Sequence, residues 1–110
     1  MRSPTSPPTG DVTFLFTDIE GSTALWDRAP EAMTESLAEH DRRINSIVDA
    51  HNGYVFTTAG DSFAVAFQDA FEAVEAALEV QLAFLESAAT LVLRVRIGVH
   101  SGVATVRNGD

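Results

Sequence analysis

Apolar and polar residues are distributed along this chain in patterns that predict four β-strands. Val12–Thr17 has apolar side chains on both faces, as in a central strand that is covered on both sides. Tyr54–Phe67 alternates on either side of Gly60-Asp61, which predicts a β-hairpin with a two-residue turn of type II′. Leu91–Val99 alternates again, so we expect a strand with one strongly apolar face that ends before the small and polar residues from Ser101 onward.

Helical periodicity fills the segments between these strands. A short helix is predicted from Ser22 to about Arg28, and a long one from about Glu31 to His51. Asn52-Gly53 ends the long helix, because Gly accepts the left-handed conformation at a helix C-terminus. Its predicted buried stripe comprises Met33, Leu37, Ile44, Ile47 and Val48.

A third helix is predicted after the hairpin. Asp69 followed by Glu72 three residues later is an acidic variant of the capping box, and the helix extends to about Ser87. We expect its buried stripe to comprise the large apolar residues Phe71, Val74, Leu78, Leu82 and Leu85.

The order of these elements predicts an α+β fold of the ferredoxin-like (palm-like) type, a βααββαβ sheet with its helices on one face. In that topology the first strand lies antiparallel to the second strand of the hairpin. Asp18 ends the first strand and Asp61 immediately precedes the other, so the two carboxylates become neighbours although they are far apart in the sequence.

Two neighbouring carboxylates repel each other, and a bound cation or a shared proton resolves the repulsion. Oxygen ligands in a chain without cysteine favour Mg²⁺ or Mn²⁺ over zinc. The backbone N–H groups of Ile19–Thr23, at a helix start, are suited to phosphate. From the residues alone a second interpretation stays open, in which Asp18 caps a helix and Asp61 is a turn residue.

Composition narrows the function classes further. The net charge of −9 argues against nucleic-acid binding and against docking on an anionic membrane. The absence of cysteine excludes disulfides, thiolate zinc sites and cysteine nucleophiles. No apolar run approaches the roughly 18 residues of a membrane span, and residues 1–10 indicate a disordered Pro/Ser/Thr tail, so we expect a cytoplasmic protein.

Three motifs in this order resemble the class III nucleotidyl cyclases, the catalytic domains of adenylate and guanylate cyclases, here of a bacterial type. They are FTDIEGST at Phe16–Thr23, TAGDSF at Thr58–Phe63 and RIGVHSG at Arg96–Gly102. The resemblance covers residues 11–110, which we interpret as the N-terminal part of a cyclase homology domain. It makes the capping and turn interpretation of the two aspartates much weaker.

The resemblance implies roles for specific residues. Asp18 and Asp61 would hold two divalent ions, Mg²⁺ or Mn²⁺, with the backbone carbonyl of Ile19 as a further ligand. Backbone amides of Glu20, Gly21, Ser22 and Thr23 would hold the β- and γ-phosphates of ATP or GTP. The expected reaction forms 3′,5′-cyclic nucleotide and pyrophosphate at an interface shared in a head-to-tail homodimer, or with another cyclase domain.

The chain departs from the family pattern in two places. Thr57 occupies the position where ATP-using cyclases usually carry an adenine-reading Lys, so base selectivity is open. The family's ribose-orienting Asn and its transition-state Arg lie beyond the equivalent of Asp110, so we expect the chain alone to be C-terminally truncated and inactive. Two alternatives remain: a non-catalytic dimerisation or regulatory module, and another palm-like enzyme such as a diguanylate cyclase, which FTDIEGST does not fit.

Other polar and aromatic residues have simpler expected places. Arg94, Arg96 and His100 share one strand face. It could face the phosphates, but we favour the interpretation that it is solvated or faces a dimer partner. The remaining expectations are a surface position for His40 and His51, a core or interface position for Trp26, and a core position for Phe63.

Overall fold

A computed structural model describes residues 7–85, 91 and 93–104 of the 110-residue chain. The elements in these residues are β1 (Gly10–Ile19), α1 (Ser22–Arg28), α2 (Pro30–Ala50), β2 (Tyr54–Ala59), β3 (Ser62–Phe67), α3 (Ala70–Leu85) and β4 (Val95–Ala104). The predicted element order and the α+β, ferredoxin-like class are confirmed.

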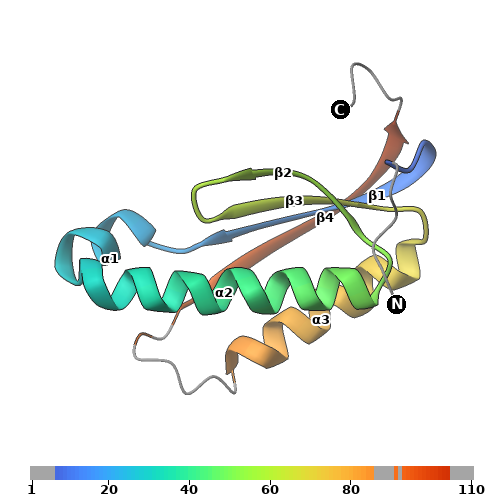
Figure 1. Cartoon of the computed structure of the whole chain (residues 1–110). Helices are drawn as coiled ribbons and strands as arrows, with labels where there is room; N and C mark the ends of the chain where they lie inside the picture. The colour runs from blue at the N-terminus through green and yellow to red at the C-terminus, as the bar shows by residue number, and fades with distance from the viewer. Residues whose placement is uncertain (1–6, 86–90, 92, 105–110) are drawn as a thin grey trace.

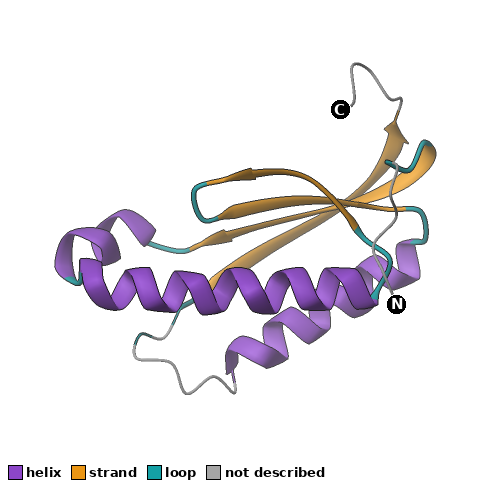
Figure 2. Cartoon of the chain, in the orientation of Figure 1, coloured by secondary structure: helices purple, strands orange, loops and turns teal. Residues whose placement is uncertain are grey.

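The four strands form one antiparallel sheet in the order β2-β3-β1-β4. The long helices α2 and α3 lie side by side along one face of this sheet (Figure 1). The other face carries no helix of the described residues (Figure 2). Strands β3 and β4 flank β1. Side chains at paired positions on these three strands therefore point to the same face, either toward the helices or toward the open face.

The main core lies between the sheet and the two long helices. Leu15 of β1 and Val65 of β3 are fully buried there against Ile44 and Val48 of α2. A second, smaller cluster of Ile19, Met33 and Leu93 closes the end of the sheet where β1 leads into α1. Each fully buried aliphatic side chain of this kind contributes about 1.5–3 kcal/mol relative to an exposed one.

The buried stripe of α2 includes a histidine that we expected on the surface. His40 is 0% exposed and lies between the rings of Phe63 and Phe84, with centroids at 5.9 and 5.4 Å. Its Nδ1 pairs with Asp41 Oδ1 at 2.8 Å. The position follows from spacing, because residue 40 lies seven positions after Met33 and four before Ile44 on the same face.

The predicted core face of α3 is wrong. The five large residues of that stripe are 50–80% exposed, and the buried face consists of Ala73, Ala76 and Val80. The helix has two apolar stripes, and the one with small side chains packs on the sheet because it lets the helix approach closely. The exposed stripe comprises Phe71, Val74, Leu78, Leu82 and Leu85.

The connection from α2 to β2 uses its two residues differently from our prediction. Asn52, not Gly53, has the left-handed conformation, with φ of 61°. Gly53 is required for packing, because a Cβ at this position would lie 2.7 Å from Val48 Cγ1 and 2.8 Å from the Phe67 ring. The hairpin turn agrees better with prediction, since Gly60 has φ of 62°.

The ends of several elements differ from the sequence prediction. β4 starts at Val95 rather than at Leu91. It continues to Ala104 because Gly10–Val12, which the sequence prediction partly assigned to the tail, extend β1 and pair with the end of β4. Asp69 caps α3 through its Oδ1, which accepts the Phe71 N–H at 2.8 Å. The predicted helix end near Ser87 and the polar residues 105–110 lie outside the described residues.

Replacing Gly53 with alanine tests the close packing at this connection. The added methyl group overlaps Val48 and Phe67, so we expect Gly53→Ala to lower the free energy of unfolding by about 1–3 kcal/mol. Urea denaturation followed by circular dichroism measures the change. Gly98→Ala is the matched control, because nothing lies within 4 Å of its added Cβ; equal losses in both variants would contradict the packing argument.

The face of α3 that packs on the sheet can be tested with a second pair of variants. Val80 is 1% exposed, so Val80→Ala should cost about 1–3 kcal/mol of unfolding free energy. Leu82 is 54% exposed, so Leu82→Ala, although it removes more atoms, should change stability by no more than about 0.5 kcal/mol. A larger loss for Leu82→Ala than for Val80→Ala would restore the original prediction.

Candidate functional site

A hollow of about 420 Å³ lies where β1 ends, close to the turn between β2 and β3. All four strands contribute to it, and no helix of the described residues does. Its lining residues are Phe16, Thr17, Asp18, Thr57, Ala59, Ser62, Phe63, Ala64, Arg96, Ile97 and Gly98. The strands thus bring two predicted site residues, Asp18 and Thr57, to one space together with Arg96.

Asp18 and Arg96 are direct cross-strand partners of β1 and β4 on the open face. Arg96 donates from Nε to Asp18 Oδ1 and from Nη2 to Asp18 Oδ2, both at 2.8 Å. This planar, two-point contact holds the carboxylate in a fixed orientation. The Arg96 hydrogen bond is the main cause of a lowered pKa for Asp18; burial opposes this shift, and the charge of Arg96 adds to it.

Asp61 lies in the β2–β3 turn beside this pair. Thr17 pairs with Phe63, so Ser62 and the preceding Asp61 reach the level of Asp18 where β1 ends. The Oδ2 atom of Asp61 is buried and has no hydrogen-bond partner among the described residues. Asp18 and Glu20 contribute with Asp61 to the negative charge around Arg96, and the Asp18 hydrogen bond is the largest cause of its raised pKa.

These oxygens are consistent with a divalent cation. An enclosed carboxylate oxygen without a partner is costly, and a metal ion would satisfy it. Each Asp18 oxygen accepts one hydrogen bond from Arg96 and keeps a further lone pair for a cation. An all-oxygen donor set suits Mg²⁺ or Mn²⁺ rather than a thiophilic metal.

The predicted triphosphate loop forms the bend from β1 into α1. Gly21 adopts the left-handed conformation, with φ of 67°, and α1 begins at Ser22. The Glu20 N–H already donates to the Arg94 carbonyl at 2.8 Å, so this amide is engaged. The N–H groups of residues 21–23 show no backbone partner within the described part of the chain. Ile19 is anchored by its side chain, which is 2% exposed.

Thr57 lies on β2 across the hollow from Asp18 and Arg96. A bulge between Val55 and Thr57 shifts the strand register, and this shift sets which β2 side chains reach the hollow. The side chain of Thr57 therefore provides a hydroxyl group at this wall of the hollow. Phe63, expected in the core, is 5% exposed and also lines the hollow.

Arg96 is the site residue whose place the sequence did not reveal. We favoured a solvated or dimer-facing strand side for it, together with Arg94 and His100, over a phosphate-facing one. The register places Arg96 opposite Asp18, His100 opposite Phe14, and Arg94 just before β4. The available signal was an arginine at alternating spacing in the last strand, but only the pairing register assigns it to Asp18.

Comparisons with known proteins agree with this geometry. The sequence profile described as "Adenylate and Guanylate cyclase catalytic domain" matches residues 5–108. The receptor-type adenylate cyclase GRESAG 4.3 of Trypanosoma brucei brucei is 49% identical over 78 residues, which cover 71% of this chain. An uncharacterised protein of Mycobacterium tuberculosis is 38% identical over 104 residues, 93% of this chain.

A solved adenylate cyclase structure from Trypanosoma brucei, described as monomeric, superimposes with a TM-score of 0.85 at 33% identity and covers 96% of this chain. The chain spans 62% of that solved chain. It spans 6% of the receptor-type cyclase and 35% of the mycobacterial protein. None of the helices in the described part of the chain has the length and apolar run needed to cross a membrane.

Proposed function

Because this chain belongs to the family of adenylate and guanylate cyclase catalytic domains, we propose that its hollow binds the metal-triphosphate part of ATP or GTP. The product would be a 3′,5′-cyclic nucleotide, with release of pyrophosphate. The observation that carries the proposal is the convergence of Asp18, Asp61 and Arg96 at one end of the open sheet face.

In this proposal Asp18 and Asp61 hold two Mg²⁺ or Mn²⁺ ions, with the Ile19 carbonyl as a further ligand. When bound, such ions neutralise triphosphate charge and lower the pKa of a coordinated hydroxyl group. The unpartnered Oδ2 of Asp61 supports the assignment, since it is a donor that the described protein groups leave unsatisfied.

Arg96 has two roles in this proposal. Without nucleotide it pairs with Asp18 and compensates the carboxylates around it. With nucleotide, its guanidinium group lies within the same hollow as the phosphates and provides five donors in a planar arrangement. The N–H groups of Gly21, Ser22 and Thr23, which have no backbone partner among the described residues, hold phosphate oxygens at the bend, while the Glu20 amide stays with Arg94.

Thr57 is the candidate base-reading position. Its hydroxyl both donates and accepts a hydrogen bond, so it does not by itself distinguish adenine from guanine. Phe16, 45% exposed on the same sheet face, supports the further proposal that a second cyclase domain covers the hollow and completes the site.

Nucleotide binding by the 110-residue polypeptide distinguishes this proposal from a non-catalytic dimerisation module. We expect Mn-ATP or Mn-GTP to give a calorimetric binding signal, and Asp18→Asn or Asp61→Asn to weaken it at least about tenfold through loss of a metal ligand. Asp11→Asn is the matched control, an exposed aspartate at the other end of β1. No heat with either nucleotide would favour the module.

Catalysis requires more than binding, so turnover is a separate test. In the family pattern a transition-state Arg follows the segment present here, and loss of one such preorganised donor costs about 10²–10³ in kcat. We therefore expect a polypeptide of residues 1–110 alone to form no measurable cyclic AMP or cyclic GMP by chromatographic assay. Robust product formation that disappears in Asp18→Ala would overturn this expectation.

A further inference from the structure

A second group of potential metal ligands lies at the opposite end of the sheet from Asp61. His51 follows the C-terminal end of α2, and Glu72 and Glu75 lie on the first half of α3. Ligand atoms of these three side chains all lie within 4.8 Å of one another. The adjoining start of β2 pairs with the end of β3, far from the turn that carries Asp61.

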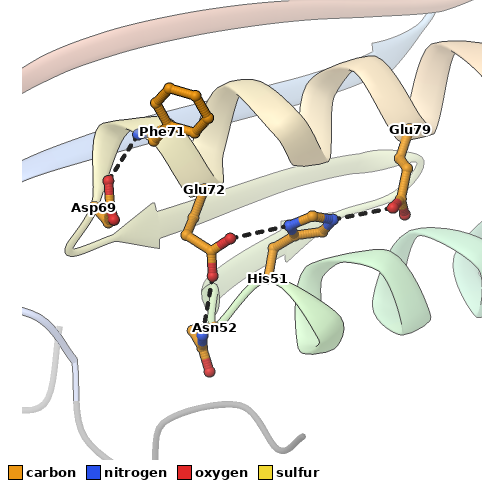
Figure 3. Close-up of polar contacts among 6 residues, drawn as sticks. All are labelled: His51, Asn52, Asp69, Phe71, Glu72 and Glu79. Atoms are coloured by element: carbon orange, nitrogen blue, oxygen red, sulfur yellow. Dashed lines mark hydrogen bonds and ion pairs between the residues drawn. The ribbon is translucent and has the colours of Figure 1, made fainter.

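The imidazole of His51 has a different carboxylate at each nitrogen (Figure 3). Its Nδ1 lies 3.2 Å from Glu72 Oε1, and its Nε2 lies 3.2 Å from Glu79 Oε1. If Nε2–H donates to Glu79, the lone pair on Nδ1 faces Glu72. This is the arrangement by which outer carboxylates orient metal-binding histidines in proteins.

The carboxylate of Glu72 is oriented as well. The Asn52 side chain donates from Nδ2 to Glu72 Oε2 at 3.0 Å, which leaves Oε1 directed at His51 (Figure 3). Glu75, one helical turn further on, makes no hydrogen bond or ion pair with another residue that the structure describes. Among the described residues, its exposed carboxylate therefore has no partner outside this cluster.

From these contacts we propose that His51, Glu72 and Glu75 bind a zinc ion that joins the end of α2 to α3. Zinc accepts imidazole nitrogen together with carboxylate oxygen, whereas Mg²⁺ prefers oxygen ligands alone. The three protein ligands leave a fourth position for water. Glu79 and Asn52 act on the site through His51 and Glu72, as orienting partners rather than ligands.

The surrounding charge favours a cation at this position. The His51 side chain is 13% exposed, and a carboxylate oxygen of Glu72 or Glu79 lies 3.2 Å from each of its ring nitrogens. A group of three carboxylates around one imidazole thus attracts positive charge. In the absence of metal, the histidine ring is held by two of these carboxylates.

Zinc titration of the chelator-treated 110-residue polypeptide tests this proposal. The background carries Asp18→Asn and Asp61→Asn, so that zinc cannot bind at the hollow. We expect one equivalent of Zn²⁺ to bind and to raise the thermal midpoint of unfolding. Glu75→Gln should weaken binding at least about tenfold, and Glu79→Gln about tenfold through loss of ring orientation.

The matched control is Glu31→Gln, an exposed residue in the first turn of α2. Its zinc affinity should equal that of the background, whereas equal affinities in Glu75→Gln and the background would overturn the proposal. Absence of zinc binding would overturn it as well. Imidazole ¹⁵N shifts of wild-type protein give an independent readout: zinc should move the Nδ1 signal of His51 and leave His40 and His100 unchanged.

Discussion

The pairing register of β1 is the constraint on which the rest of this structure depends. β1 is hydrogen-bonded to β3 on one side and to β4 on the other. Its last residues therefore determine which residues of β3 and β4 lie beside Asp18. Because side chains alternate between faces, a shift of one residue would move Asp18 from the open face into the core. Arg96 would then face no carboxylate of β1.

This register is itself fixed by burial on the other face. Leu15 and its neighbours two residues away point to the helices, opposite Val65 and Val99. Leu15 and Val65 are fully buried, so a one-residue slip of either strand would move one of them out of the core. The apolar face thereby determines where the polar face places its charges, and the geometry of the candidate site is a consequence of packing on the far side of the sheet.

The sequence predicted the element order because strand alternation and helical periodicity are local signals. The core face of α3 could not be predicted in that way, since its two apolar stripes differ in size and not in kind. Choosing Ala73, Ala76 and Val80 requires knowing how closely α3 approaches the sheet. The burial of His40 was not predicted for a related reason. Its spacing from Met33 and Ile44 indicated the buried face, but we gave more weight to the polar character of histidine.

The residues of the candidate site also differ in whether local patterns or tertiary contacts determine their positions. The expected meeting of Asp18 and Asp61 needed only the connectivity of the ferredoxin-like fold, whereas Arg96 needed the exact partner of Asp18 in β4. The hydrogen bond of the Glu20 amide also depends on β4, because its acceptor is the backbone carbonyl of Arg94, the residue before this strand. Contacts with the last strand are therefore where prediction from sequence is weakest.

The two ends of the sheet differ in the kind of charge compensation they offer. At the hollow, Asp18 has an arginine partner while Asp61 keeps an unsatisfied oxygen, so the donor set for a cation is oxygen. Around His51 the compensation is an imidazole between carboxylates of α3. Hard and borderline cations differ in their preference for these donors, so the two proposed metal sites would remain chemically separate within one small domain. The separation would rest on ligand type, even though both clusters carry negative charge.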